Sequence, residues 1–250
     1  TYTWTADRNC SVGFMFAYAG KENRVGEFSL AQLEKKPYPT SFTDGTRTAE
    51  RLTIPTEGVL SLQEGTVECW VYVPEFWEPG VLNWRRIWGI GGEAGAGMYV
   101  FRYYPSRDKM VFSIYDDAGK EQNVSIDKPP VGWHLFSTRW SAVEMALLVD
   151  GVKVGSIDNP KLPNQFADTL FYVGSRAGSI MDNPNTLIDD LRISNRARTD
   201  EEILAAYQSN KPLQRDEDTT YLLSFNGSIY PVEQCWVPLG TFWSLDWDSP

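Results

Sequence analysis

The fold class is decided by the stretch Glu144-Met145-Ala146-Leu147-Leu148-Val149-Asp150-Gly151-Val152-Lys153-Val154-Gly155. Asp-Gly between two apolar runs is the strongest short-range sign of a β-hairpin, because a type I′ turn requires positive φ at both central residues. The stretch therefore predicts two antiparallel strands, over residues 144–149 and 152–155.

Further short apolar stretches, separated by turn residues, extend in both directions from this hairpin. Their spacing of about 8 to 12 residues is typical of β-sandwiches. A second hairpin is expected around Asp116-Asp117-Ala118-Gly119, between strands at 110–115 and 122–126. The remaining strands are expected over residues 66–73, 86–90, 97–104, 133–140, 170–174, 187–194 and 221–225, and over 12–18 and 25–30 near the start. The predicted class is all-β.

One short helix is predicted, over residues 200–208. Thr199 and Glu202 have the spacing of a capping box, in which each side chain accepts a hydrogen bond from a backbone N–H of the first helical turn. Ile203, Leu204 and Tyr207 then follow at helical spacing. The helix follows directly after the strand expected at 187–194.

The composition narrows the classes of partner. The chain of 250 residues has 10 Trp, 12 Tyr and 12 Phe beside 20 Gly and 15 Pro, which suits pleated sheets joined by turns. Its 33 acidic and 23 basic residues give a net charge of −10, which disfavours nucleic acids and anionic membrane surfaces. No apolar run approaches the roughly 18 to 20 residues that cross a bilayer. We therefore expect no nucleic-acid partner and no membrane insertion.

The three cysteines leave two interpretations open. Cys10, Cys69 and Cys235 lie far apart and lack the paired spacing of a zinc site. They are either buried thiols that act as small hydrophobic residues, or Cys10 and Cys235 form a disulfide that joins the two ends. Because the sequence begins with Thr1 and has no signal peptide, we expect it to be a piece of a longer polypeptide.

Five segments, taken in order, resemble the laminin-G-like, concanavalin A-like lectin family of jelly-roll domains. They are Glu64-Gly65-Thr66-Val67-Glu68-Cys69-Trp70-Val71, Gly132-Trp133-His134-Leu135-Phe136-Ser137-Thr138-Arg139-Trp140, Leu148-Val149-Asp150-Gly151-Val152, Phe171-Tyr172-Val173-Gly174 and Leu187-Ile188-Asp189-Asp190-Leu191-Arg192-Ile193-Ser194-Asn195-Arg196-Ala197-Arg198. The resemblance covers about residues 45 to 208. It implies a concanavalin A-like jelly-roll β-sandwich of two antiparallel sheets with one short helix.

The flanking segments suggest three parts of the chain. Pro37 and Pro39 interrupt the pattern, so residues 1–40 are expected to be N-terminal strands or a connector that packs on the sandwich. Residues 41–230 are expected to form the laminin-G-like domain, and 231–250 an aromatic C-terminal tail. The segment 31–42 resembles connectors of phage tail proteins, which implies a phage tail or secreted multidomain parent.

The resemblance implies a non-catalytic carbohydrate-binding or adhesion module that recognises a cell-surface or extracellular glycan. Such a module would be extracellular or on a virion surface. The alternative is a structural or interaction domain of a phage virion or tail, which packs on neighbouring domains or chains of a larger polypeptide or forms a homo-oligomer. A fold alone does not decide between these functions.

Catalysis is not expected. The glucanase branch of this fold resembles retaining glycosidases, which hold two carboxylates about 5 Å apart, normally from a Glu-x-Asp-x-x-Glu strand. The chain has no Glu-x-Asp triplet. His134, the only histidine, lies between Trp133 and Leu135 in an expected strand, where a structural role is favoured over that of a catalytic base.

Two segments supply the residue types that bind sugars, which are flat aromatic rings beside polar donors. The first is the loop expected over 76–86, with Trp77, Asn83, Trp84 and Arg85. The second is the end of the strand expected over 97–104, with Arg102 and Tyr104. These six residues are the predicted ligand-binding residues.

The resemblance implies calcium as the cofactor, because jelly rolls of this superfamily often bind a calcium ion where a loop carbonyl meets an aspartate of the Ile-Asp-x-x-Arg strand. The matching residue is Asp189, and Asn226 of the Phe-Asn-Gly turn is the second predicted ligand. The other interpretation is that Asp189 pairs with a basic residue such as Arg192, or caps a turn.

Overall fold

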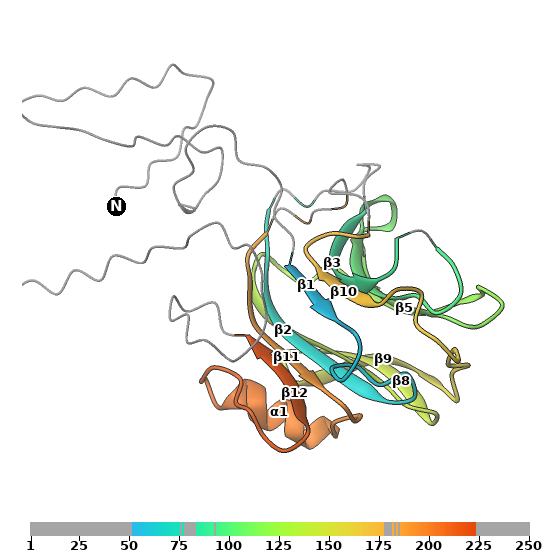
Figure 1. The fold of residues 1–250 in the computed structure, drawn as a ribbon. Coiled ribbons are helices and arrows are strands. Elements are labelled where there is room, and N and C mark those ends of the chain that lie inside the picture. The colour runs from blue at the N-terminus through green and yellow to red at the C-terminus, as the bar shows by residue number, and fades with distance from the viewer. Residues whose placement is uncertain are drawn as a thin grey trace, which may run out of the picture. The chain divides into compact units, whose positions relative to one another are not determined.

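The computed structural model describes residues 52–75, 77, 84–92, 94–177, 182, 184 and 186–223. These residues form two six-stranded antiparallel sheets that face each other, with one short α-helix (Figure 1). The predictions for the strands at 12–18 and 25–30, for the parts 1–40 and 231–250, and for Cys10, Cys235 and Asn226 all fall outside the described residues.

The spatial order of the strands gives the topology of each sheet. Sheet A contains, in this order, β1 (Leu52–Pro55), β10 (Leu170–Val173), β3 (Arg85–Ile90), β4 (Tyr99–Tyr104), β5 (Lys109–Tyr115) and β6 (Glu121–Asp127). Sheet B contains β12 (Thr219–Leu223), β11 (Ile188–Ser194), β2 (Gly65–Val73), β7 (Gly132–Trp140), β8 (Glu144–Val149) and β9 (Val152–Asp158). This arrangement confirms the predicted jelly-roll β-sandwich.

The two strongest local predictions are confirmed. At the turn between β8 and β9, Asp150 has φ of 53° and Gly151 has φ of 79°, as a type I′ turn requires. Helix α1 spans Asp200–Gln208, and both hydrogen bonds of the capping box between Thr199 and Glu202 are formed. Strand β1 and the short 3-10 helix η1 (Pro105–Arg107) were not predicted.

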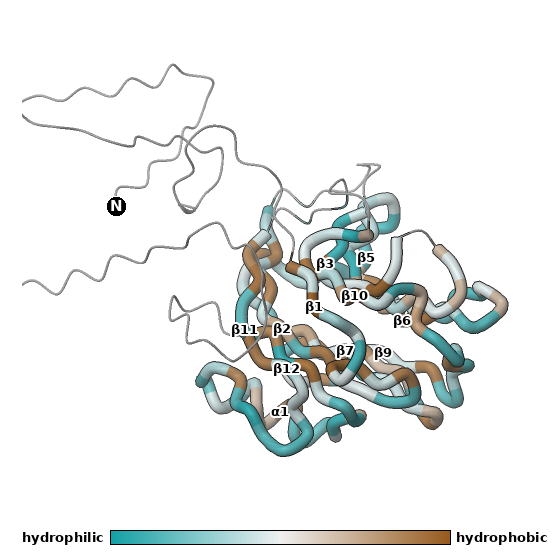
Figure 2. The backbone as a smooth tube through the Cα atoms, in the orientation of Figure 1, coloured by the Kyte–Doolittle hydropathy of each residue, from teal (hydrophilic) through white to brown (hydrophobic). Residues whose placement is uncertain are grey.

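The core lies between the two sheets, where the inward side chains of both interdigitate. The hydrophobic residues that Figure 2 shows along β2, β7 and β11 belong to sheet B. Large rings fill the centre: Trp88 stacks on Phe171 with ring centroids 5.2 Å apart, and Trp140 contacts Phe112. The indole of Trp140 lies where a side chain at position 65 would be, so only Gly65 fits there.

Helix α1 packs on the outward face of sheet B. Ile203 is completely buried against Ala146 and Leu148 of β8. A Cβ atom added to Gly151 would lie 2.8 Å from Leu204, so the β8–β9 turn and the helix approach each other closely. In the part of the chain that the structure describes, no helix has the length and hydropathy to cross a membrane.

Candidate functional site

Three of the predicted ligand-binding residues form one cluster on the outward face of sheet A. Trp84 directly precedes β3, and Arg102 and Tyr104 belong to β4. The Arg102 guanidinium carbon lies 4.2 Å from the centroid of the Trp84 ring and 5.9 Å from that of Tyr104. The two rings meet edge to face, with centroids 5.7 Å apart. We call Trp84, Arg102 and Tyr104 the Trp84 cluster.

The alternation of side chains along β4 explains why these residues meet. Successive residues of a strand point to opposite faces of its sheet. Phe101 and Tyr103 belong to the hydrophobic core between the sheets, so Arg102 and Tyr104 point the other way. The antiparallel pairing of β3 with β4 then brings the start of β3, beside Trp84, to the end of β4.

Arg102 is the most enclosed member of the cluster. Only 3 % of the residue is exposed, and its Nη2 atom donates to Glu121 Oε1 at 3.0 Å. The hydroxyl of Ser113 donates to the same carboxylate oxygen at 2.6 Å. The Nε and Nη1 atoms of Arg102 are buried without a hydrogen-bond acceptor. Below the Trp84 ring, the guanidinium is therefore held by one ion pair and a cation–π contact.

Other arginines surround the cluster. Arg86 of β3 lies directly opposite Arg102 and donates to the carbonyl oxygens of Gly91 and Gly92 at 2.8 and 3.1 Å. The guanidinium carbon of Arg107 lies 5.0 Å from the centroid of the Tyr104 ring. Burial lowers the pKa of Arg85, which nevertheless stays charged at neutral pH because arginine begins far above that range.

The other three predicted residues have different surroundings. Trp77 is 1 % exposed, its indole N–H donates to the carbonyl oxygen of Pro184 at 2.8 Å, and its ring stacks on Tyr103 with centroids 5.0 Å apart. Arg85 lies in β3 opposite Tyr103. Asn83 lies outside the described residues. A ligand-binding role for Trp77 stays a prediction, and its ring would have to leave the core to fulfil it.

Asp189, the predicted calcium ligand, is half-buried in β11. Its Oδ1 atom accepts a hydrogen bond from the Asp190 N–H at 2.8 Å. Arg192, the suggested alternative partner, instead donates from Nε to Glu68 at 2.7 Å. Within the described ranges, no group of three or more Cys, His, Asp or Glu side chains is arranged to hold a metal. Because Asn226 is not described, the calcium site stays a prediction.

His134 has a structural role in the β8–β9 turn. Its Nδ1 atom lies 2.7 Å from Asp150 Oδ2, and its Nε2 atom lies 3.0 Å from the carbonyl oxygen of Pro130. The other carboxylate oxygen of Asp150 accepts the Leu135 N–H at 3.0 Å. Both ring nitrogens are thus occupied by partners that hold the loop and the turn together.

Among the described residues, each carboxylate with a shifted pKa is paired with an arginine or a lysine. Desolvation opposes the shift at Glu144, but hydrogen bonds from Arg139 and Lys153 give a net lowering of its pKa. Hydrogen bonds from Arg196 lower the pKa of Glu202 to about 2, and those from Arg198 lower the pKa of Asp216. A general acid at neutral pH requires a shift in the opposite direction.

Two residues of the site were not predicted. Glu121 and Ser113 complete the Arg102 network: the hairpin of β5 and β6 was expected, but the pairing of β5 with β4, which brings both side chains to Arg102, was not. Outside the site, on sheet B, Trp133 is the one exposed aromatic side chain of the described part, at 44 %. Its place in β7 was predicted, and alternation from the buried Phe136 gives the face on which it lies.

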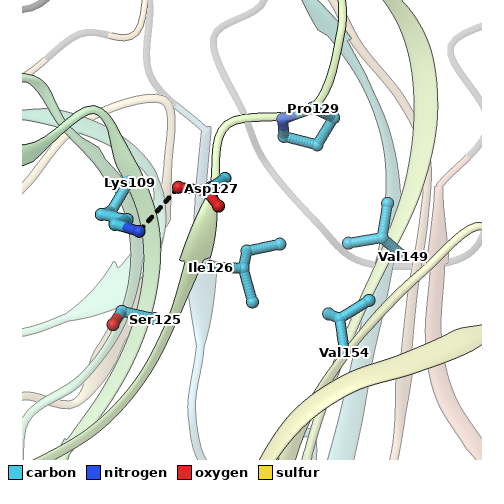
Figure 3. A pocket seen from close by; sticks show the side chains of 7 residues that line it. All are labelled: Lys109, Ser125, Ile126, Asp127, Pro129, Val149 and Val154. Carbon is cyan, nitrogen blue, oxygen red and sulfur yellow. Dashed lines mark hydrogen bonds and ion pairs between the residues drawn. The ribbon is translucent and has the colours of Figure 1, made fainter.

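A shallow pocket opens at the edge of the sandwich, between β6 and the β8–β9 hairpin. It has a volume of about 460 Å³, and Figure 3 shows Ile126, Pro129, Val149 and Val154 around it. Lys109 and Asp127, which form an ion pair of 2.6 Å, lie on one side. We call this the edge pocket. Its lining combines these apolar residues with Lys109, Ser125 and Asp127 and contains no aromatic ring, in contrast to the Trp84 cluster.

Comparison with solved structures agrees with the fold. A putative carbohydrate-binding protein from Bacteroides ovatus is similar with a TM-score of 0.51 and 18 % identity, over 67 % of this chain and 46 % of its own. The ligand-binding domain of botulinum neurotoxin serotype D, in complex with N-acetylneuraminic acid, is similar with a TM-score of 0.51 and 14 % identity, over 64 % of this chain and 40 % of its own. Each similarity spans less than half of the other chain.

A protein described as the HCR/D F1240A mutant is similar with a TM-score of 0.52 and 14 % identity, over 65 % of this chain and 41 % of its own. At these identities the similarity shows the fold alone. No curated protein sequence matches the chain. The family model Laminin_G_3 matches residues 44–204, which include all five segments that suggested the family. The chain therefore belongs to the Laminin_G_3 family of the concanavalin A-like lectin/glucanases superfamily.

Proposed function

We propose that this domain is a non-catalytic carbohydrate-binding module and that its sugar site is the Trp84 cluster. The observation that carries the proposal is the meeting of Trp84, Tyr104 and Arg102 on the outward face of sheet A. A sugar ring packs its C–H face on an aromatic ring, while its hydroxyl groups need donors and acceptors beside that ring. Both kinds of group are present within one cluster.

The carboxylate chemistry supports binding without catalysis. Glycoside hydrolysis needs a carboxylic acid with a raised pKa close to a second carboxylate. Glu144, Glu202 and Asp216, the carboxyl groups with shifted pKa values, are all shifted downward by their cationic partners. The superfamily includes glucanases as well as lectins, so this argument rests on the residues of this chain.

Calorimetric titration against a panel of glycans tests the proposal. Trp84→Ala and Tyr104→Ala should each weaken binding about tenfold or more, as expected for aromatic residues at the centre of a binding site. Trp133→Ala is the matched control, since it removes an exposed tryptophan from the other sheet. Equal losses in Trp84→Ala and Trp133→Ala, or no glycan bound at all, would contradict the proposal.

We also propose that the domain binds calcium through Asp189, with Asn226 as a second ligand. A cation that binds only the folded state stabilises it by about 2.7 kcal/mol at 100 times its Kd. Millimolar calcium should therefore raise the melting temperature relative to EDTA, and Asp189→Ala should abolish the increase. Asp158→Ala, at the exposed end of β9, is the control. A melting temperature that does not respond to calcium would contradict this site.

The second candidate function is that of an interaction domain, in which the sandwich packs on neighbouring chains. The exposed valines beside the edge pocket favour it: Val131, Val152 and Val154 are 54 %, 59 % and 43 % exposed. Sedimentation velocity over a range of concentrations tests self-association. Val154→Lys should dissociate an oligomer built on this edge, whereas Val143→Lys, at 72 % exposed in the β7–β8 turn, should not. Monomers at all concentrations would contradict a homo-oligomer.

With either function, we propose that the domain is located outside the cell or on a virion surface.

A further inference from the structure

The side chain of Arg102 has more hydrogen-bond donors than its surroundings use. The side chain is 4 % exposed, its Nη2 atom donates to Glu121, and the Tyr115 hydroxyl is a further hydrogen-bond partner of the guanidinium. Nε and Nη1 are buried without an acceptor. A buried donor that has lost its water and gained no acceptor destabilises the folded state, and native structures contain few such groups. In the absence of a ligand, Arg102 therefore has two buried nitrogen atoms that could donate to an acceptor.

The local charge favours an anionic acceptor. Arg86 lies directly opposite Arg102 in the neighbouring strand, the Arg107 guanidinium lies on the Tyr104 ring, and Glu121 is the carboxylate that pairs with Arg102. Oxygen Oε1 of Glu121 is shared with the hydroxyl of Ser113. A positively charged patch in a chain of net charge −10 attracts anions locally, although the whole protein repels them.

The chemistry of the donors also favours a carboxylate over a neutral hydroxyl. Guanidinium groups only donate, and their hydrogen bonds to ionised acceptors are roughly twice as strong as neutral ones. A neutral sugar could accept hydrogen bonds from the guanidinium but would not compensate its positive charge. The carboxylate of an acidic sugar would do both.

We propose that the Trp84 cluster selects acidic sugars and that Arg102 is the specificity-determining residue, which receives the sugar carboxylate. This inference rests on the proposed carbohydrate-binding function. Trp84 covers the guanidinium at 4.2 Å, so the ring moves aside when the carboxylate binds. The displaced ring exchanges its cation–π contact with Arg102 for contact with the sugar.

The first test compares an oligosaccharide of uronic acids with its carboxyl-reduced form, which differs only in lacking the charge. Calorimetry should show at least about tenfold tighter binding of the acidic form, as expected for a charge-assisted hydrogen bond. Higher salt should weaken the binding of the acidic form more than that of the neutral form. Equal binding of the two forms overturns the inference and leaves the carbohydrate-binding function intact. If neither form and no other glycan of the panel binds, the carbohydrate-binding function itself is contradicted.

Three variants locate the specificity. Arg102→Gln should remove the preference for the acidic form, and Glu121→Gln should increase it severalfold, because the competing carboxylate is lost while the amide oxygen still accepts from Ser113. Arg215→Gln is the control for Arg102→Gln: it removes one positive charge from an exposed loop and should leave the preference unchanged. If Arg102→Gln fails to fold, Glu121→Gln still decides, since an unchanged or weaker preference in that variant overturns the inference.

The movement of Trp84 gives a readout that a purely structural arginine would not produce. In protein labelled with 5-fluorotryptophan, the Trp84 fluorine resonance is assigned by its absence in Trp84→Phe. The acidic oligosaccharide should shift this resonance and leave that of the buried Trp77 in place. A Trp84 resonance that stays unchanged at saturation contradicts the proposed displacement.

Discussion

Glu68 of β2 and Arg192 of β11 form an ion pair of 2.7 Å in which the two side chains are 0 % and 6 % exposed. The two residues lie directly opposite each other in sheet B, and Arg198 Nε lies 3.6 Å from the same carboxylate oxygen. The carboxylate therefore compensates two enclosed guanidinium groups.

Because removal of Glu68 would leave the Arg192 guanidinium buried without its ion-pair partner, while Arg198 keeps its ion pair with Asp216, Glu68→Ala should lower the free energy of unfolding by about 3 to 5 kcal/mol. Urea denaturation measures the change. Glu57→Ala, which removes an exposed carboxylate in the turn after β1, should change the stability by less than about 0.5 kcal/mol. A similar small change in Glu68→Ala would show that water or rearranged neighbours replace the carboxylate.

Gly151 and Gly58 allow backbone strain to be separated from a steric clash. Both have positive φ, of 79° and 71°, but a Cβ atom at Gly151 would lie 2.8 Å from Leu204, whereas at Gly58 it would meet nothing within 4 Å. Gly58→Ala should lower the free energy of unfolding by about 1 to 2 kcal/mol through strain alone. Gly151→Ala should cost roughly 1 to 3 kcal/mol more, because helix α1 must shift. Equal losses in chemical denaturation would mean that the helix yields without cost.

Local chemistry made much of the fold predictable. The Asp150-Gly151 turn and the Thr199 capping box depend on neighbouring residues only, and both are formed as expected. Strand β1 was missed because it has four residues, ends in Pro55 and gains its place only by pairing with β10. The order of the strands in each sheet likewise depends on contacts between distant segments, for which the family resemblance, rather than residue spacing, provided the prediction.

The candidate site was predictable in its residue types and less so in its geometry. Trp84, Arg102 and Tyr104 were selected as aromatic and cationic residues near loops, and the alternation along β4 brings them together. Trp77 was selected on the same grounds, yet its ring enters the core and stacks on Tyr103. No local pattern distinguishes a loop tryptophan that turns inward from one that lies on the sheet.

Truncation of Trp77 should destabilise the fold far more than truncation of Trp133. Trp77 is 1 % exposed and Trp133 is 44 % exposed. Trp77→Ala should lower the free energy of unfolding by roughly 3 to 5 kcal/mol, because it leaves a large cavity beside Tyr103 and an unpaired carbonyl at Pro184. Trp133→Ala should cost less than about 1.5 kcal/mol, since it loses mainly its edge contact with Tyr72. Comparable losses for the two variants in urea would contradict the burial of Trp77.

The ion pair between Arg196 and Glu202 predicts a loss of stability in acid. Two hydrogen bonds of 2.6 and 2.8 Å from Arg196 hold the pKa of Glu202 at about 2 in the folded protein, compared with about 4.3 when unfolded. A carboxyl group with a lowered pKa stabilises the fold above its unfolded pKa, and this contribution disappears as the pH falls through its folded pKa. We therefore expect the contribution of Glu202 to be complete above about pH 5 and to fall progressively towards pH 2.

Melting temperatures of the wild type and of Glu202→Gln between pH 7 and pH 2 measure this contribution. Glutamine retains the capping box with Thr199, so the substitution removes the charge and leaves the helix cap in place. The wild type should melt at the higher temperature at pH 7, and the difference should shrink as Glu202 takes up its proton. Glu201→Gln, one residue earlier on the exposed side of the same helical turn, should show no such pH dependence. A difference for Glu202→Gln that stays constant down to pH 2 would mean that the carboxylate contributes by packing rather than by its charge.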